Sequence, residues 1–491
     1  MLCFLKTALL KQNFDGGAQP KIDPPIKSAI ILPFMNEQTA KLIDLDKKYL
    51  WHPFTQMADW LKSGPVVIDS AEGFHLIDTE GNRYIDGVSS LWCNVHGHRV
   101  KEIDDAIKGQ IDKVSHSTLL GLGQTKSIEL AEKLVRIVPW RLEKVFYSDS
   151  GATAVEIALK MAYQYFQNGG QKKRTKFIAL ESSYHGDTIG SVSLGGIKMF
   201  HSIFRPLLFE TFFVPAPYPY RFEGSKEECA LYSLNKIEGI LKNHSDQIVA
   251  VVIEPLVQAA GGIIVHPHGL LKSVRELTRK YGVLLIADEV ATGFGKTGKM
   301  FACENEGICP DIMCLGKGIT GGYLPLAATL TTREIFDAFL GDVAEHKTFY
   351  HGHTYTGNAL ASAAALASLE LFQQNKIIES LPAKIELMKQ YFAKTKDLPF
   401  VGDARQCGLM GAIEIVKDKS GKESFAPRLT IGAGLCLSMR PAGVMLRPLG
   451  DCIVVMPPVA IDLDLLEKLL NIIFRSVENE LPKIIGNCDA D

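Results

Sequence analysis

Apolar residues recur along this chain in two patterns, as unbroken runs and at helical spacing. Residues 248–253 and 283–287 are unbroken apolar runs, which are typical of strands buried on both faces of a parallel sheet. Residues 269–281, which lie between them, place apolar side chains at helical spacing. A strand, a helix and a second strand in this order predict a βαβ unit.

The same two patterns predict the elements on the N-terminal side of this unit. Helices are expected at residues 102–114, 125–138 and 151–166, and strands at residues 143–149 and from Lys176 onward. Before them, residues 66–93 alternate between apolar and polar with a tight turn at residues 80–82. This alternation predicts an antiparallel meander.

The C-terminal part reads differently, because residues 371–491 combine long helices with short strands. We therefore expect an α/β protein, with a mostly parallel central sheet in a large domain and a small α+β domain. The predicted division has an extension at residues 1–34, an N-terminal segment with the meander at 35–93, a large domain at 94–365 and a small domain at 366–491. The N-terminal segment is expected to join the small domain.

The first 34 residues have a composition of their own. Their apolar runs are far shorter than the roughly 20 residues that a membrane span needs. They contain no arginine, which argues against a mitochondrial transit peptide. Our hypothesis is a disordered extension, or a start site placed too early.

Composition narrows the class of partner. With 491 residues and 46% hydrophobic content, the chain is long enough for more than one core. Its 53 basic and 55 acidic residues favour neither nucleic acid nor an anionic membrane. Small-molecule substrates are the expectation.

Cysteine and histidine usage bears on compartment and metals. Ten cysteines occur without a C-x-x-C motif, which suits a reducing cytoplasm. Two H-x-H pairs occur, but no third ligand cluster accompanies them, so no metal site is predicted. These pairs are His96 with His98, and His351 with His353.

Two candidate reactive groups follow apolar strands. Asp288 ends the run at 283–287, at the sheet edge where open α/β folds bind ligands, and Lys317 follows a second apolar run in LGKG. A carboxylate and an amine at one sheet edge suit pyridoxal phosphate, whose aldehyde bonds to a lysine and whose ring nitrogen pairs with an acid. A turn lysine and a capping aspartate are the alternatives.

A glycine-rich segment between these two groups offers competing interpretations. Residues 293–298, GFGKTG, fit the G-x-G-x-x-G pattern, but no helical period follows, so a dinucleotide site is weakly indicated. The GKT within it lacks the glycine of a P-loop, because Val290 stands five residues before Gly295.

Longer motifs carry a resemblance to a family. IADEVATGFGKTGKMFACE, PDIMCLGKGITGGYLPLAATLTT, WHPFTQM, YHGDT and RPLG resemble segments of the class III pyridoxal-phosphate aminotransferases. The resemblance is narrower still to the members that aminate 8-amino-7-oxononanoate to 7,8-diaminononanoate in biotin synthesis. It implies fold type I, a cytoplasmic homodimer with shared active sites, and S-adenosylmethionine or lysine as amino donor. Other class III enzymes, such as an ω-amino acid aminotransferase or an aminomutase, are the alternatives.

The resemblance also assigns roles to residues around the cofactor. Lys317 is the catalytic lysine that bonds the cofactor, and Asp288 pairs with the ring nitrogen. The start of the helix at Gly151 and Ala152 is a site for the phosphate, which its free N–H groups suit. The remaining cofactor contacts implied are Tyr184 and Val290 on the two ring faces, Glu254 behind the ring, and His353 with Thr354, the threonine reaching the phosphate of the neighbouring subunit.

Substrate contacts are implied in the same way. Arg447 in LRPLG matches the arginine that binds the substrate carboxylate, a task that suits a bidentate cation. The other residues implied are Phe54, Leu91, Trp92, Tyr184 and Gly352. Three positions depart from the family pattern: Phe54 stands where relatives often have Tyr, Leu91 where they have Trp, and His353 where some have Pro.

Overall fold

The computed structural model describes residues 35–488, so the predicted extension at 1–34 lies outside the described residues. By their internal contacts the described residues fall into two compact units, which divide between Val67 and Ile68. The described part of the first unit contains α1 (Glu37–Tyr49) and α2 (Met57–Trp60). Within it, Asp46 accepts hydrogen bonds from the indole of Trp60 (2.7 Å) and from His52 (2.9 Å).

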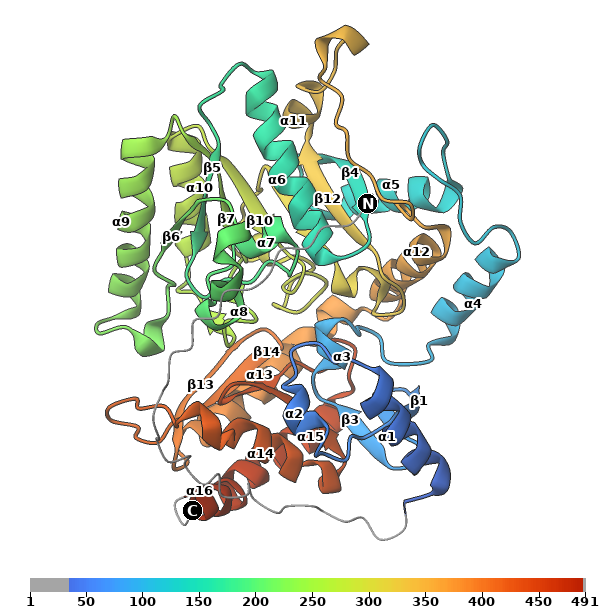
Figure 1. Cartoon of the computed structure of the whole chain (residues 1–491), viewed down its shortest axis with the longest axis vertical. Helices are drawn as coiled ribbons and strands as arrows, with labels where there is room; N and C mark the ends of the chain where they lie inside the picture. Colours follow the sequence, from blue (N-terminus) through green and yellow to red (C-terminus); the bar gives the residue numbers. More distant parts are fainter. Residues whose placement is uncertain (1–34, 489–491) are drawn as a thin grey trace, which may run out of the picture. The chain divides into compact units, whose positions relative to one another are not determined.

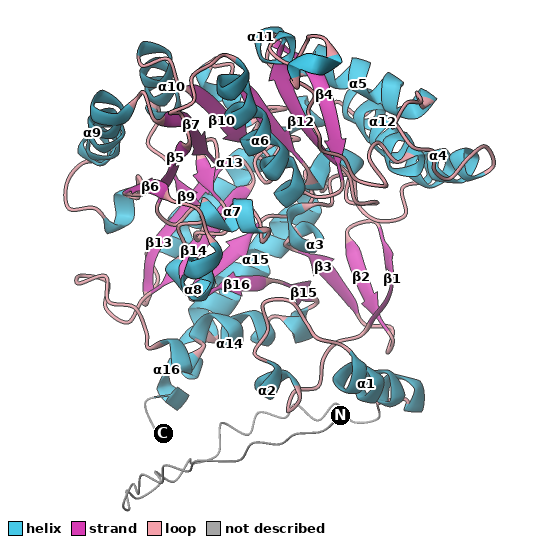
Figure 2. Cartoon of the chain, turned by 45° about the horizontal axis from the view of Figure 1, so that its top comes forward, coloured by secondary structure: helices cyan, strands magenta, loops and turns pink. Residues whose placement is uncertain are grey.

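The second unit is built on a seven-stranded sheet (Figures 1 and 2). All neighbours pair in parallel except β12, which is antiparallel to both of its neighbours, so the predicted mostly parallel sheet is confirmed. In spatial order the strands are β4 (Leu142–Ser148), β12 (Ala327–Thr332), β11 (Ile312–Leu315), β10 (Leu284–Asp288), β7 (Ile248–Ile253), β5 (Lys176–Leu180) and β6 (Thr211–Val214).

Helices cover both faces of this sheet because its central strands bury both faces. In β10, Ile286 packs in the cluster formed with α6 (Gly151–Asn168), whereas Leu285 and Ala287 point into the opposite cluster. That opposite cluster is shared with α5 (Thr125–Ile137), α10 (Leu270–Lys280) and α12 (Ala359–Gln374). The sandwich explains why the central strands read as unbroken apolar runs.

The predicted meander forms as β1 (Ile68–Glu72), β2 (His75–Asp78) and β3 (Arg83–Asp86). A short C-terminal strand, β15 (Val444–Met445), pairs in parallel with β3. The predicted meander ran to residue 93, and this end was wrong. The strands stop at Asp86, and residues 89–92 adopt positive φ angles.

The C-terminal part holds a four-stranded antiparallel sheet in the order β13–β14–β17–β16. Apolar residues of α13 (Ile377–Lys396) and α15 (Leu463–Asn479) share its core, as the α+β prediction expects. The strands are β13 (Val401–Cys407), β14 (Met410–Ile415), β16 (Arg447–Leu449) and β17 (Cys452–Val455). The boundaries predicted at 93 and 365 stay predictions.

The remaining α-helices and strands of the described chain lie between or beside these elements in sequence. The helices are α3 (Ser89–Trp92), α4 (Lys101–Ile111), α7 (Ile189–Ser193), α8 (Lys198–His201), α9 (Lys226–His244), α11 (Arg333–Asp337), α14 (Ile431–Ser438) and α16 (Leu481–Cys488), and the strands are β8 (Val257–Gln258) and β9 (Ile264–Val265). Within residues 35–488, no helix has the length and apolar character to cross a bilayer.

Candidate active site

The chemistry-bearing side chains collect where the parallel strands of the large sheet end. Asp288 is the last residue of β10, and Glu254 follows β7 directly. Lys317 comes two residues after β11, at the start of a short 3-10 helix, Lys317–Thr320. Carboxyl ends of parallel strands share one sheet edge, which is where α/β proteins bind ligands.

Asp288 forms a buried pair with His185. Its Oδ2 lies 2.7 Å from Nδ1 of His185, and its Oδ1 accepts the N–H of Val290 at 3.1 Å. Burial alone would lower the pKa of His185, but the bond to Asp288 and the nearby negative charges outweigh it and raise that pKa. Nε2 of His185 is buried without a hydrogen-bond partner among the described residues. The imidazole of His185 therefore holds one carboxylate oxygen of Asp288 in place.

Glu254 is a second buried carboxyl at this edge. Its Oε1 accepts the N–H of Tyr184 (3.1 Å), and its Oε2 accepts the N–H of Ala259 (2.8 Å). Burial raises its pKa to about 7, and the charge of Asp288 adds to this shift. The phenol of Tyr184 donates to Asp187 at 2.6 Å, so hydrogen bonds hold Tyr184 both at its backbone N–H and at its phenol oxygen.

Lys317, a half-buried residue, presents its amine to the same region. Burial lowers the pKa of its ammonium, while Asp288 and Glu254 oppose the shift. Its Nζ lies over the ring of Trp92, 5.1 Å from the centroid, in cation–π geometry. An amine with a lowered pKa loses its proton readily, as a nucleophile or base must.

The first turn of α6 lies against these groups. Ser150 caps the helix by accepting the N–H of Thr153, which leaves the N–H groups of Gly151 and Ala152 without an intrahelical acceptor. A Cβ atom at Gly151 would lie 2.4 Å from Cγ1 of Val290. Only glycine lets the helix start approach Val290 this closely, and free N–H groups there suit an anion.

Trp92 and Leu91 belong to an unusual turn. Ser89, Ser90, Leu91 and Trp92 have φ angles of 46°, 49°, 72° and 68°, one turn of left-handed helix without a glycine. Trp92 is buried and Leu91 is half exposed. The left-handed conformation costs roughly 1–2 kcal/mol for each such residue, so this turn is strained.

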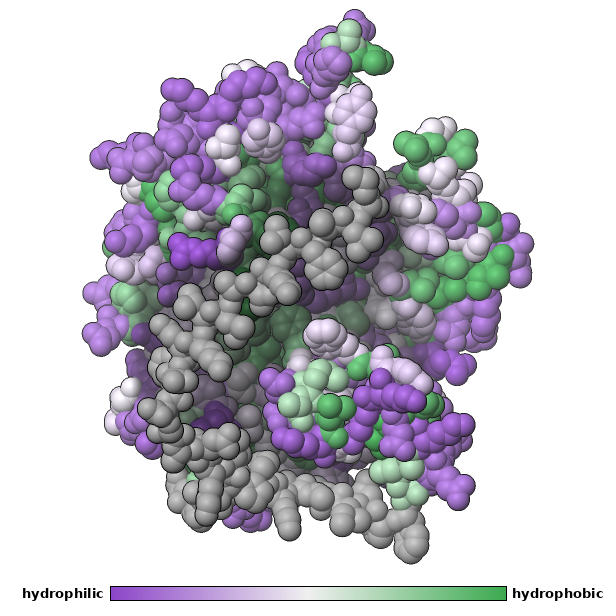
Figure 3. All heavy atoms as spheres, in the orientation of Figure 1, coloured by the Kyte–Doolittle hydropathy of each residue, from purple (hydrophilic) through white to green (hydrophobic). Residues whose placement is uncertain are grey.

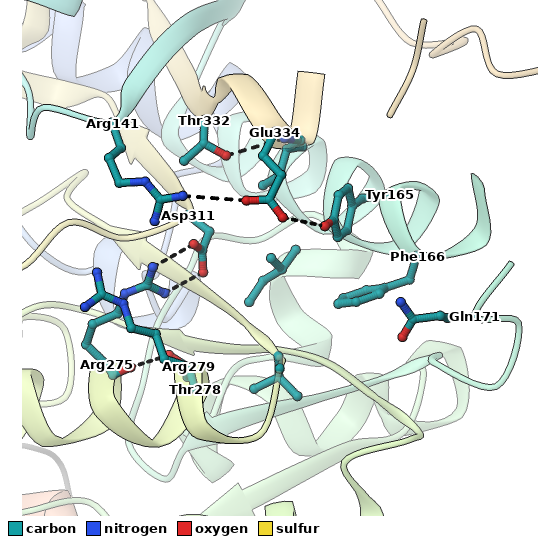
Figure 4. A pocket seen from close by; sticks show the side chains of 14 residues that line it. Arg141, Tyr165, Phe166, Gln171, Arg275, Thr278, Arg279, Asp311, Thr332 and Glu334 are labelled. Carbon is teal, nitrogen blue, oxygen red and sulfur yellow. Dashed lines mark hydrogen bonds and ion pairs between the residues drawn. The ribbon is translucent and has the colours of Figure 1, made fainter. Parts of the chain in front are cut away.

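A separate cavity of about 320 Å³ lies at the opposite edge of the sheet, where β10 and β11 begin (Figure 4). Arg275, which is buried, forms a bidentate pair with Asp311 there, at 2.6 and 2.8 Å. Glu334 contacts Arg141 and the phenol of Tyr165. None of the predicted site residues lines this cavity.

Comparison with known proteins decides the family. The sequence model of the aminotransferase class-III family matches residues 57–477. The chain is a class III aminotransferase. It is 54% identical over 443 residues to the adenosylmethionine-8-amino-7-oxononanoate aminotransferase of Nitratidesulfovibrio vulgaris, covering 89% of this chain and 82% of that protein.

Solved structures agree with the fold of this aminotransferase. The crystal structure of adenosylmethionine-8-amino-7-oxononanoate aminotransferase from Methanocaldococcus jannaschii superposes with a TM-score of 0.85 at 46% identity, covering 89% of this chain and 98% of that one. A PLP-bound amine transaminase from an uncultivated Pseudomonas species gives 0.83 at 33% identity, with 88% and 99% covered. The aminotransferase therefore has fold type I.

The residues of the aminotransferase fit pyridoxal phosphate. A lysine with a lowered pKa, a carboxylate fixed by an imidazole, and free N–H groups at a glycine-lined helix start are the donors that an aldehyde, a ring nitrogen and a phosphate require. Among the described residues, no group of three or more His, Cys, Asp and Glu side chains is arranged to hold a metal ion.

The remaining predicted residues of the aminotransferase lie in the loop before α12, on β16 and in the other compact unit. Nδ1 of His353 is 2.8 Å from Asp149, immediately before the helix start at Ser150. Gly352 and Thr354 are exposed in the same loop, and Arg447 is exposed on β16. Phe54 belongs to the other compact unit. Their roles stay predictions.

Sequence reasoning missed three side chains of the aminotransferase site. His185 gave no signal of its partner, which lies 103 positions away. Lys296, in the glycine segment set aside above, is fully buried, and its Nζ donates to Oγ of Ser89 at 3.0 Å. Asp86 ends β3 and binds the left-handed turn. The sequence gives no signal for the burial of Lys296, because its neighbours are Gly295 and Thr297.

Proposed function

We propose that this chain transfers an amino group from S-adenosylmethionine to 8-amino-7-oxononanoate, giving 7,8-diaminononanoate for biotin synthesis, with pyridoxal 5'-phosphate as cofactor. The observation that carries the proposal is the amine of Lys317 beside Asp288, in a chain 54% identical to an enzyme named for this reaction. The choice of S-adenosylmethionine as amino donor is supported by the names of these relatives, which include adenosylmethionine.

The residues divide the work of holding the cofactor. Asp288, held in place by His185, would accept a hydrogen bond from the protonated ring nitrogen and so keep that nitrogen protonated. The N–H groups of Gly151 and Ala152 bind the phosphate at the positive end of α6. Val290 and Tyr184 cover the two ring faces, and Glu254 fixes the backbone of Tyr184.

Bound in this way, the cofactor supplies an electron sink and carries the amino group between the two substrates. Lys317 holds and moves the proton. Burial lowers the pKa of its ammonium, which favours the neutral amine that takes a proton from the substrate carbon and returns it elsewhere. Trp92 covers Nζ and limits the access of water.

Substrate residues are assigned with the same proposal. Arg447 binds the carboxylate of 8-amino-7-oxononanoate, because a guanidinium pairs with a carboxylate in bidentate fashion. Leu91 and Trp92 contact the substrate chain. Phe54 and Gly352 complete the set.

The homodimer is part of the proposal. Exposed apolar side chains follow α4, where Leu120 is 90% and Leu122 is 61% exposed, and Figure 3 shows apolar atoms gathered at this side of the molecule. Tyr355, beside Thr354, is also exposed. In a dimer, a second copy would cover these side chains, and Thr354 would reach the cofactor phosphate of that copy. Light scattering tests the dimer, and the proposal expects twice the mass of one chain.

A cytoplasmic location also belongs to the proposal. All nine cysteines among the described residues are free thiols, as is usual in a reducing compartment.

Product analysis tests the reaction. Purified holoprotein receives 8-amino-7-oxononanoate with S-adenosylmethionine, with lysine, or with an ω-amino acid, and 7,8-diaminononanoate is quantified by mass spectrometry. The proposal expects product with S-adenosylmethionine. If product forms with lysine but not with S-adenosylmethionine, lysine is the amino donor. Turnover of ω-amino acids without any 7,8-diaminononanoate would contradict the biotin step.

A further inference from the structure

The left-handed turn Ser89–Trp92 needs an external support. Side chains with a Cβ avoid positive φ, and single residues of this kind are usually Asn, Asp or Gly. Here four consecutive residues of other types have positive φ. Two backbone hydrogen bonds close the turn, from the N–H of Trp92 to the carbonyl of Val88 (2.8 Å) and from the N–H of Cys93 to that of Ser89 (3.0 Å). Such a conformation persists only where its surroundings hold it.

The carboxylate of Asp86 supplies that support. Asp86 is completely buried at the end of β3, on a strand paired on both sides. Its Oδ1 accepts the N–H of Ser90 (2.8 Å), and its Oδ2 accepts the hydroxyl of Ser90 (2.7 Å). His98 approaches the same oxygen at 3.1 Å and keeps the carboxylate in place. Ser90 is thus tied by both its backbone and its side chain.

A second tie holds the preceding residue. Oγ of Ser89 accepts from Nζ of Lys296 (3.0 Å) and donates to the carbonyl of Met456 (2.9 Å). The two ties fix the first half of the turn, and its second half carries Leu91 and Trp92. The ring of Trp92 then lies over Nζ of Lys317.

We propose that Asp86 is a positioning residue, whose carboxylate holds the left-handed turn Ser89–Trp92 and thereby keeps Trp92 in place over Lys317. Asp86 acts through Ser90 and touches neither substrate nor cofactor. The inference rests on the proposed function only where it concerns the binding of substrate; the conformation of the turn is tested independently.

Four variants separate this role from a general contribution to folding. Asp86→Ala removes the support. Ser90→Gly, added to Asp86→Ala, reduces the need for it, because glycine at one of the four positions adopts positive φ without steric cost. Ser90→Gly alone is the second control. Asp78→Ala is the matched control, because Asp78 is also a buried aspartate at a strand end, bonded to Asn82 and Tyr84 instead of the turn.

The first readout needs neither cofactor nor substrate. The thiol of Cys93 lies 3.2 Å from the carbonyl of Ser90, so it reports whether the turn is formed. The rate of its alkylation by iodoacetamide is followed by peptide mass spectrometry. Loss of charge-assisted bonds to Ser90 is expected to accelerate alkylation of Cys93 by about tenfold or more in Asp86→Ala. The double variant is expected to recover part of this change, because glycine at position 90 relieves the strain at one of the four residues.

The second readout is the apparent affinity for the amino donor, from the absorbance change of the bound cofactor. Asp86→Ala is expected to weaken it by about tenfold while cofactor remains bound, and the double variant to recover part of the loss. Alkylation of Cys93 at the unchanged rate in Asp86→Ala would overturn the inference. Equal acceleration in Asp78→Ala, or no recovery in the double variant, would also overturn it.

Failure to fold and failure of the proposed function are both distinguishable. If Asp86→Ala is insoluble, Asp86→Asn, which keeps one acceptor for the N–H of Ser90 but loses the charge, is expected to show a smaller acceleration in the same direction. If the unchanged protein does not use S-adenosylmethionine, the proposed function fails, while the alkylation of Cys93 still decides the role of Asp86.

Discussion

The buried carboxyl of Glu254 predicts an unusual dependence of stability on pH. Burial raises its pKa from 4.5 to about 7. Between these values the unfolded chain releases the proton while the native protein keeps it, so stability falls as pH rises through this window. With 1.36 kcal/mol for each pKa unit, Glu254 lowers the stability of the cofactor-free protein by roughly 2–3 kcal/mol more at pH 8 than at pH 5.

Replacement of Glu254 by glutamine removes this slope. Glutamine cannot ionise, but it has one acceptor oxygen where the carboxylate offers two, so either Tyr184 or Ala259 loses its acceptor. That loss costs about 1–3 kcal/mol at every pH. The variant is therefore expected to be less stable than the unchanged protein at pH 5 and to approach or exceed it at pH 8.

Urea unfolding of the cofactor-free protein, followed by circular dichroism at pH 5, 6, 7 and 8, measures the difference between the two proteins. Glu276→Gln, on the exposed surface of α10, is the matched control and is expected to run parallel to the unchanged protein. If Glu254→Gln also runs parallel at all four pH values, Glu254 ionises normally in the native protein and the reasoning is refuted.

Three further substitutions probe the same site. Gly151→Ala forces Val290 aside and is expected to weaken cofactor binding by about tenfold, with recovery in Gly151→Ala/Val290→Ala; Gly109→Ala, which meets no atom within 4 Å, serves as control, and a control that weakens equally refutes the steric argument. His185→Leu removes the bond to the ring-binding carboxylate and is expected to weaken cofactor binding about 10- to 100-fold, whereas His185→Asn, with an amide nitrogen near the place of Nδ1, keeps most of it; fluorescence titration with cofactor measures both. Burial lowers the pKa of Lys296 to about 8, so Lys296→Met is expected to stabilise the cofactor-free protein by about 2 kcal/mol at pH 7, a gain that shrinks between pH 8 and 10; urea midpoints that differ equally at pH 7 and 10 speak against it.

Periodic burial explains which parts of the fold could be predicted. The runs at β7 and β10 pack against helices on both faces, so hydrophobicity alone marks them as strands of a parallel sheet. Asp288 and Lys317 stand at the ends of such runs, and parallel strands bring their ends to one edge. Prediction succeeded where a local pattern and the sheet topology together determine position.

Features that depend on distant partners could not be predicted. The left-handed turn has no glycine or asparagine to announce it, and its support comes from Asp86 and from Lys296, 207 positions away from Ser89. The pair of His185 and Asp288 likewise joins the loop after β5 to the end of β10, which are far apart in sequence. No local rule assigns such partners, because only the folded sheet brings them together.

Reduction of the holoprotein with sodium borohydride, followed by peptide mass spectrometry, tests the central claim most directly. Reduction converts the bond between cofactor and lysine into a stable one, so the modified residue is identified by its mass. Among the described residues, burial lowers the pKa of three lysines, Lys317, Lys296 and Lys384. The account predicts the cofactor on Lys317 alone. Modification of Lys296 or of Lys384, or of no lysine, would contradict it.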